Sequence, residues 1–131
     1  MSAPGPSAAI CALQVSALPS DRFCFEGFLP KGATKRQKTL VSLAQDERTM
    51  IFFESPKRLL AVLRQMKEVF GDRYAAVCRE LTKVHEEVLR GDLTSLIECL
   101  EERGSIKGEI VIVVCGERYW KKRRRKAEQH V

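Results

Sequence analysis

The densest group of residues that could do chemistry runs from Arg79 to Glu87, with the sequence RELTKVHEE. It combines carboxylates that can accept a proton, a histidine whose charge changes near neutral pH, and cations that can bind phosphate. If this stretch is extended, successive side chains alternate between two faces, so Glu80 and Thr82 share one face. Composition alone favours the plainer alternative, in which these are the solvated charges of a strand pair.

The same stretch does not match a metal-binding pattern. Glu86 and Glu87 are neighbours, so in a strand they point to opposite faces and leave only His85 and Glu87 on one side. The order HEE also differs from the H-E-x-x-H motif of zinc enzymes. We therefore expect no metal. A cysteine–histidine nucleophile stays open, although nothing visible in the sequence activates a thiol.

A second polar group, ESPKR, runs from Glu54 to Arg58 and follows an apolar run. The run TMIFF is short and rich in β-branched and aromatic residues, which predicts a buried strand. The serine and proline then predict the start of a helix that continues to Phe70. Open α/β sheets bind ligands where a strand ends and a helix begins. The ESPKR segment is therefore either a polar wall of a ligand cleft or an ordinary capped helix start.

Hydrophobic periodicity predicts the elements that position both groups. Strands are expected at residues 23–28, 49–54, 74–81, 84–90 and 108–116. Helices are expected after caps at Ser7, Thr34, Ser55 and Asp92, with stops at Pro19, Gly71 and Gly104. The helix after Thr34 is expected to expose its start, Lys35-Arg36-Gln37-Lys38. The β-branched run after Gly108 is typical of a strand covered on both faces, so we expect it at the centre of an α/β sheet.

The length of 131 residues fits one domain. The run from Lys121 to Lys126 holds six of the 23 basic residues, which leaves 17 against 17 acidic residues elsewhere, so the net charge of +6 is a property of this run. Such runs are usually disordered and solvated, and the alternative is a non-specific clamp on phosphates. Tyr119 and Trp120, just before it, are expected either to stack on bases or to close the core.

Five cysteines, at positions 11, 24, 78, 99 and 115, lie in apolar runs and form no C-x-x-C pair. This pattern indicates small buried side chains in a reducing compartment rather than disulfides or a zinc framework, so we expect a cytoplasmic protein. No signal peptide is visible. The longest apolar run, Ile110 to Cys115, is far too short to cross a bilayer.

Four motifs together carry a family resemblance. In chain order they are GPSAAICALQVSALPSDRFCFEGFLPKG, FFESPKRLL, RELTKVHEEVLRG and KGEIVIVVCG, within a span from Ala3 to Gly116. The combination closely resembles the carboxyl-terminal half of the bacterial methyltransferases that 2′-O-methylate a cytidine ribose in 16S ribosomal RNA. Those enzymes belong to the tetrapyrrole-methylase-like class of S-adenosylmethionine-dependent methyltransferases.

The resemblance implies a fold. The family has two α/β domains with S-adenosylmethionine in the cleft between them, and this chain would supply the second, an α/β/α domain with a mixed, roughly five-stranded sheet flanked by helices. By this comparison residues 1–20 are an inter-domain loop and short helix, residues 21–118 the carboxyl-terminal α/β domain, and residues 119–131 a basic tail. The amino-terminal domain, with its glycine-rich cofactor loop, is expected to be absent.

The resemblance also implies roles for individual residues at matching motif positions. The expected cofactor-binding residues are Pro6, Ser7, Ala8, Phe53, Lys107, Gly108 and Glu109. The expected RNA-facing residues are Arg58, Arg79, Lys83 and His85. The expected catalytic carboxylates are Glu54, Glu80 and Glu86. One of them would accept the proton of the ribose 2′-hydroxyl as its oxygen displaces the sulfonium methyl group.

The resemblance thus implies a partial methyltransferase whose partners are 16S ribosomal RNA and the 30S subunit. The main alternative is a non-catalytic remnant that binds RNA or pairs with itself. A relative acting on a tetrapyrrole is a third interpretation, which the ESPKR and HEE motifs oppose. Without the other domain, the face near Pro6, Phe53 and Gly108 would be apolar and exposed, so we expect a homodimer or association through that face.

Overall fold

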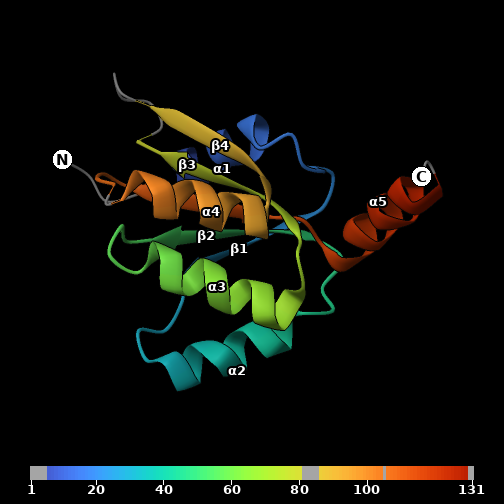
Figure 1. Cartoon of the computed structure of the whole chain (residues 1–131), viewed down its shortest axis with the longest axis horizontal. Helices are drawn as coiled ribbons and strands as arrows, with labels where there is room; N and C mark the ends of the chain where they lie inside the picture. Colours follow the sequence, from blue (N-terminus) through green and yellow to red (C-terminus); the bar gives the residue numbers. More distant parts are fainter. Residues whose placement is uncertain (1–5, 81–85, 105, 130–131) are drawn as a thin grey trace.

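The computed structural model describes residues 6–80, 86–104 and 106–129. Within them, five strands form one open sheet with helices on both faces (Figure 1). The strands are β1 (Phe23–Phe28), β2 (Thr49–Glu54), β3 (Tyr74–Arg79), β4 (Glu87–Asp92) and β5 (Ile110–Val114). The helices are α1 (Pro6–Val15), α2 (Ala33–Leu43), α3 (Leu59–Phe70), α4 (Leu93–Arg103) and α5 (Glu117–Gln129). The predicted α/β/α domain with a mixed five-stranded sheet is confirmed.

The order of the strands across the sheet is β1-β2-β5-β3-β4. β1 and β2 are parallel, whereas β5 runs antiparallel to both β2 and β3, and β4 runs antiparallel to β3. β5 therefore lies at the centre, as predicted, and all five of its residues are buried. Its Ile-Val-Ile-Val-Val sequence explains this position, because β-branched side chains pack well on both faces of a covered strand.

The side chains of the sheet alternate between two cores on its opposite faces. Helices α2, α3 and α4 cover the first core, which contains Phe52 at its centre. Helix α1 covers the second core, into which it inserts Leu13. Because α1 packs mainly on β5, it leaves the β1 side of this face open. Phe25 and Phe28 of β1 are accordingly 51% and 56% exposed.

Two predicted helix caps, at Ser7 and Thr34, are wrong. The first helix already begins at Pro6, which places Ser7 inside it. The second begins at Ala33 after Gly32, and no side chain caps it. Proline at a first helical position and glycine at an N-cap both start a helix without a capping hydroxyl, which explains the earlier starts.

The predicted start of α3 at Ser55 and Pro56 is also wrong, because α3 begins at Leu59. The residues before it form a tight turn in which the Arg58 amide donates to the Ser55 carbonyl at 3.2 Å. The Ser55 amide donates to the Glu54 carboxylate at 2.6 Å. The carboxylate at the end of β2, rather than the serine hydroxyl, therefore satisfies the first free amide of this segment.

The predicted start and stop of α4 are confirmed. Asp92 accepts a hydrogen bond from the Ser95 amide at 2.8 Å. Gly104 ends the helix with a φ of +77°, a left-handed conformation that glycine adopts without a clash of Cβ. Gly71 ends α3 in the same way, with a φ of +86°.

The third and fourth strands are displaced from their predicted ranges. β3 ends at Arg79 instead of residue 81, because Glu80 has a φ of +51° that an extended strand cannot contain. β4 spans Glu87–Asp92 instead of residues 84–90. Residues 81–85, which include the Thr82-Lys83 connection, lie outside the described part of the chain.

The prediction that Arg36 is exposed at the start of α2 is wrong, because this residue is only 7% exposed. Its guanidinium donates to the Gln65 side chain of α3 at 2.5 Å and to the Lys31 carbonyl at 3.2 Å. The aliphatic part of an arginine can be buried while its head forms such bonds. Arg36 therefore fastens α2 to α3.

Arg73, in the connection between α3 and β3, is 1% exposed. Its guanidinium donates to three backbone carbonyls, those of Ala44, Phe70 and Cys115, at 2.7, 3.0 and 3.0 Å. The same group lies over the rings of Phe70 and Trp120, at 5.2 and 5.0 Å from their centroids. One buried cation thus joins the ends of α2, α3 and β5.

The basic run, which such composition usually leaves disordered, is part of helix α5, Glu117–Gln129 (Figure 1). Trp120, in its first turn, donates from Nε1 to the Asp72 carbonyl at 3.0 Å. Its ring also stacks on the buried Arg73. Of the two predicted roles for Trp120, the structure supports closure of the core.

Replacing Arg73 with Met should destabilise the domain strongly. The change leaves three carbonyls, two of them buried, without their donor, so we expect a loss of about 3–5 kcal/mol in the free energy of unfolding by urea. The matched control is Arg64→Met, which breaks an exposed pair with Glu101 and should cost within about 0.5 kcal/mol. Equal urea midpoints for the two variants would contradict this assignment.

Candidate functional site

The strand directions bring the motif residues to one edge of the sheet, which we call the site edge and which is formed by residues 54–58, 79–80, 86–87 and 107–109. β2 and β3 end at this edge, whereas β4 and β5 begin there. Glu54 and Arg79 both pair with Ile110 in the register of the sheet. Motifs far apart in the sequence therefore meet at one place, at the left of Figure 1.

Glu54, predicted to be catalytic, is almost fully buried, with a side chain 1% exposed. Its Oε2 accepts from the Ser55 amide at 2.6 Å and from Arg58 Nε at 3.0 Å. Arg58, predicted to face RNA, is thus held in an ion pair with a buried carboxylate, and its own side chain is 28% exposed. These contacts give both side chains a structural role in closing the β2–α3 turn.

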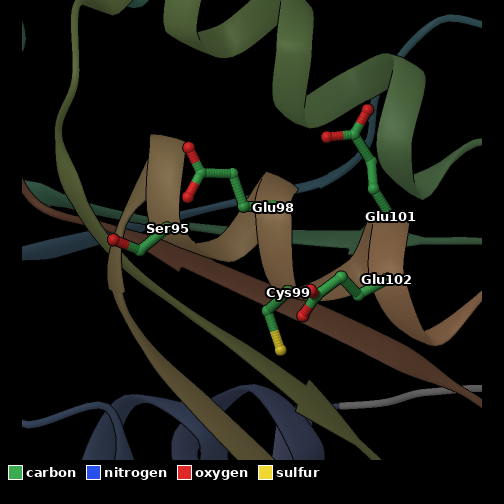
Figure 2. Close-up of a pocket in the computed structure, with 5 residues that line it drawn as sticks. All are labelled: Ser95, Glu98, Cys99, Glu101 and Glu102. Atoms are coloured by element: carbon green, nitrogen blue, oxygen red, sulfur yellow. The ribbon is translucent and has the colours of Figure 1, made fainter.

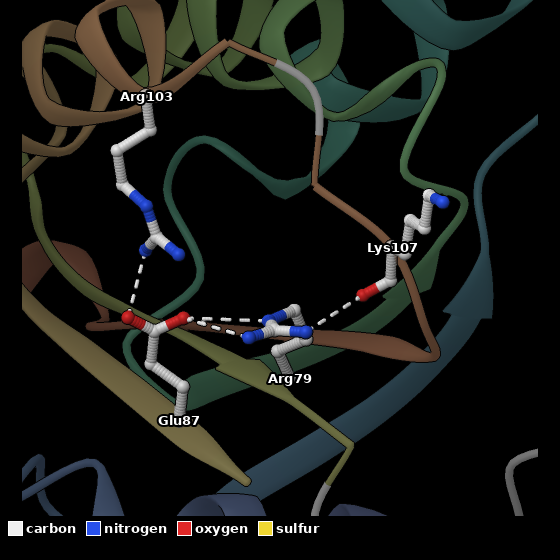
Figure 3. A network of polar contacts seen from close by, with 4 residues as sticks. All are labelled: Arg79, Glu87, Arg103 and Lys107. Carbon is white, nitrogen blue, oxygen red and sulfur yellow. Dashed lines mark hydrogen bonds and ion pairs between the residues drawn. The ribbon is translucent and has the colours of Figure 1, made fainter. Parts of the chain in front are cut away.

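Arg79 and Glu87 form the centre of a polar network at the site edge (Figure 3). Glu87 Oε1 accepts from Arg79 Nε and one terminal nitrogen, both at 3.3 Å, and its Oε2 accepts from Arg103 of α4 at 2.7 Å. Arg79 also donates to the Lys107 carbonyl at 3.2 Å. The network ties β3, β4, α4 and the turn before β5 together.

The two arginines hold the pKa of the Glu87 carboxyl below its ordinary 4.5. The hydrogen bond from Arg103 is the largest cause, and the Arg79 hydrogen bond and charge add to it. Glu87 is therefore a fixed anion rather than a proton carrier near neutral pH. The pKa of Arg103 is raised by the same bond.

Glu80 lies against the turn formed by residues 107–109. Its amide donates to the Glu109 carbonyl at 2.9 Å. A Cβ at Gly108, which has a φ of +101°, would overlap the Glu80 side chain. A glutamate with a left-handed backbone (φ +51°) is uncommon, and such strain concentrates at functional sites. Of the three carboxylates predicted to be catalytic, Glu80 therefore has the geometry most typical of a functional residue.

The predicted cofactor-binding residues are placed differently. Pro6, Ser7 and Ala8 form the first turn of α1 instead of a loop, and Ala8 packs against the second core. Phe53 is 4% exposed. The rings of Phe25 and Phe28 lie edge-on to it, at 5.0 and 5.6 Å. Lys107, Gly108 and Glu109 lie at the site edge, next to Glu80.

Of the remaining predicted residues, Glu86 is exposed just before β4. Lys83 and His85 lie outside the described residues, so their placement stays a prediction. The described ranges contain no group of three or more His, Cys, Asp or Glu that could hold a metal ion.

The buried cysteines are not activated nucleophiles. Burial raises the pKa of the Cys78 thiol to about 12 and those of Cys24 and Cys115 to about 11. These thiols are therefore protonated at neutral pH and inert. All five cysteines are free, which agrees with the predicted absence of a disulfide framework. No helix in the described part of the chain is long and apolar enough to span a membrane.

A surface hollow of about 540 Å³ lies along α4, lined by Ser95, Glu98, Cys99, Glu101 and Glu102 (Figure 2). Its three carboxylates would repel phosphate groups. One of them, Glu101, already pairs with Arg64 of α3 at 2.6 Å. Size alone therefore does not make this hollow the site.

The sequence predicted Glu80 as a site residue but not its left-handed backbone, and it did not reveal Arg103 as part of the site. The Arg79–Glu87 pair had a signal, since the two residues face each other across the β3–β4 ladder. No sequence signal pointed to Arg103, because its contact with Glu87 depends on how α4 folds back over β4.

Comparisons with known proteins show the family of the chain. The family described as Tetrapyrrole (Corrin/Porphyrin) Methylases matches residues 2–97, which is more than half of the chain. The chain belongs to the tetrapyrrole methylase family. Proteins called ribosomal RNA small subunit methyltransferase I are similar to it: the one from Mycobacterium tuberculosis (strain CDC 1551 / Oshkosh) is 51% identical over 114 residues, and that of Thermotoga maritima 45% identical over 114 residues.

These matches cover 86% and 87% of this chain, but only 39% and 50% of the M. tuberculosis and T. maritima proteins. The chain therefore spans half of their length or less. Among solved structures, cobalt precorrin-4 methyltransferase, a cobalamin biosynthetic enzyme, matches with a TM-score of 0.62 at 19% identity. That match covers 86% of this chain and 50% of the other, and it shows the shared fold.

Removing the Glu87 charge should lower stability at neutral pH and leave acid stability unchanged. The folded-state pKa is depressed, so the stabilisation is fully present above pH 4.5 and is lost as the pH falls through the lower folded value. Urea midpoints of the wild type and Glu87→Gln should therefore differ at pH 7 and converge as the pH falls through the folded-state pKa of Glu87. The matched control is Glu98→Gln on the exposed side of α4. A gap between wild type and Glu87→Gln that stays constant as the pH is lowered from 7 would contradict the ion-pair assignment.

Proposed function

We propose that this chain forms the carboxyl-terminal half of an S-adenosylmethionine-dependent methyltransferase that 2′-O-methylates a cytidine ribose in 16S ribosomal RNA, in the cytoplasm. The observation that carries the proposal is the 45–51% identity to proteins called ribosomal RNA small subunit methyltransferase I. The gathering of the ESPKR, RELTKVHEE and KGE motifs at the site edge supports it. Identity at this level favours an enzyme over the non-catalytic remnant.

The turn of residues 107–109 fits S-adenosylmethionine in its chemistry. Gly108 has no side chain, which leaves room for the Glu80 carboxylate to lie against the turn. Glu80 offers carboxylate oxygens that can accept hydrogen bonds from ribose hydroxyls. When bound, S-adenosylmethionine supplies a methyl group on a positively charged sulfur. Phe53 does not offer a free ring face, because Phe25 and Phe28 pack against it.

The residues of this chain would act by positioning the two substrates and by accepting a proton. Transfer of a methyl group to the ribose 2′-oxygen would release the hydroxyl proton, which a carboxylate of this chain would accept. Glu80 is the best-placed acceptor, since Glu54 is held by Arg58 and the Ser55 amide. The fixed Arg79–Glu87 pair would keep the strand beneath Glu80 in place.

The test uses a chimera in which this chain replaces the matching 114 residues of the M. tuberculosis relative. With tritiated S-adenosylmethionine and unmodified 30S subunits, we expect label in 16S RNA at a nucleotide whose 3′ linkage resists alkaline hydrolysis. Glu80→Gln should lower kcat by about 100-fold or more, whereas Glu101→Gln, an exposed control, should stay within about twofold.

Two results would contradict these assignments separately. Label on a base, a ribosomal protein or a tetrapyrrole would overturn the proposed reaction. Full turnover by the Gln variants of Glu54, Glu80 and Glu86 would overturn the proposed proton acceptor while leaving the reaction intact.

We also propose that the isolated chain associates with itself through the open side of the second face. Phe23, Phe25 and Phe28 are 40–56% exposed there, and exposed apolar patches mark interaction surfaces. The shift in register between Phe25 and Gly27 interrupts the edge strand β1. Irregular edges resist the addition of a further strand, so the contact would use side chains.

Light scattering at increasing concentration tests the association. The wild type should exceed the 14.9 kDa of the monomer, and a Phe25→Ser/Phe28→Ser variant should return to it. The control is Val41→Ser, which removes a comparably exposed apolar side chain from α2, in the layer of helices that covers the opposite face. A wild-type mass of one monomer at the highest concentration would refute the proposal.

A further inference from the structure

Helix α5, which we call the basic arm, projects from the end of the sheet opposite the site edge (Figure 1). Only its first turns touch the body of the domain. The Glu117 amide donates to the Asp46 carbonyl at 3.0 Å, and Trp120 bonds the Asp72 carbonyl. Residues 121–129 are all exposed. The arm is therefore rooted at one end and surrounded by solvent along the rest.

The arm has two distinct faces. On the inner face, Arg123 lies 4.3 Å from the ring of Tyr74, and Arg124 lies 4.6 Å from the ring of Trp120. These two guanidinium groups are used in stacking at the root. Arg118, Lys122 and Arg125 have the spacing i, i+4 and i+7, so they share the opposite, exposed face. That face presents three cations in a row to solvent.

Most of the charge of the arm is not balanced within it, although Lys121 pairs with Glu117 at 2.9 Å. Residues 117–129 hold seven Lys or Arg and two Glu, a net charge of +5 out of +6 for the whole chain. The pairs 118/122, 121/125 and 122/126 place like charges one helical turn apart, which destabilises a helix. A short helix without a packed face is already marginal in water. A polyanion on the outer face would relieve this repulsion.

We propose that the basic arm binds the phosphate backbone of RNA, as a second contact remote from the site edge. Closely spaced phosphates match a row of cations and release their own counterions on binding. An acidic membrane is the weaker partner, because beyond Trp120 the arm has no apolar face, only Ala127, to insert between lipids. The choice of RNA as the polymer rests on the proposed function.

The position of the arm fits a large substrate. The arm follows the end of β5, whereas the site edge lies where β5 begins, so the strand of five residues separates them by about 17 Å. A small ligand cannot reach both, but a folded RNA can. Because of this separation, the arm would add affinity without taking part in methyl transfer.

The test measures binding of the whole chain to a fluorescein-labelled RNA duplex of about 20 base pairs, in titrations at several salt concentrations. No S-adenosylmethionine is present, so the result is independent of whether the proposed methyl transfer is right. The variant is Arg118→Gln/Lys122→Gln/Arg125→Gln, on the outer face. The control is Lys31→Gln/Lys35→Gln/Lys38→Gln, which removes the same charge from exposed positions in and just before α2.

The arm variant should bind at least about tenfold more weakly, and its plot of log affinity against log salt should be about 2–3 units less steep. The α2 control should keep most of the affinity and the slope. Emission from Trp120, the single tryptophan, should change on binding to the wild type because it lies at the root of the arm. Equal weakening of both variants would overturn the proposal, as would phosphatidylserine vesicles binding the arm more tightly than RNA.

Discussion

The structure depends on one buried cation, the guanidinium of Arg73. It donates to the carbonyls that end α2, α3 and β5, and it lies between the rings of Phe70 and Trp120. Burial lowers its pKa, yet a guanidinium is not deprotonated in proteins, so each of its three nitrogens needs an acceptor. This requirement fixes the end of the sheet from which α5 leaves.

The site edge lies at the opposite end of the sheet from Arg73. At the site edge the connections carry charged residues and strained backbone instead of apolar contacts, as the left-handed Glu80 shows. The Arg79–Glu87–Arg103 network holds this edge with ion pairs that are partly exposed. In open α/β sheets the packed core commonly provides a rigid scaffold, and polar loops at one edge of the sheet bind ligands.

Much of this could be predicted from the sequence, because its signals were local. The β-branched run of β5 predicted that this strand lies at the centre of the sheet, and Asp92 and Gly104 predicted where α4 begins and ends. The predicted starts of α1, α2 and α3 were wrong, because each was assigned to a capping hydroxyl. A proline begins α1, a glycine precedes α2, and the Glu54 carboxylate accepts the amide hydrogen bond before α3. Arg36 and Arg73 were missed because a charged residue looks exposed until its distant partners are known.

The candidate site shows the same limit. The motifs predicted residues that the fold does bring to one edge of the sheet. They did not show which of these side chains are already engaged by other parts of the protein. Arg58 and Arg79 turned out to be held in ion pairs, and Phe53 to be packed under other aromatic rings. Such pairings depend on strand register and helix placement, which local pattern does not encode.

The central claim is that the site edge contains part of an S-adenosylmethionine site. Calorimetric titration of S-adenosylmethionine into the purified chain tests it most directly. The account predicts saturable binding with one site per chain. Heats no larger than dilution, up to the highest concentration that stays in solution, would contradict it and would place the decisive cofactor contacts outside this chain.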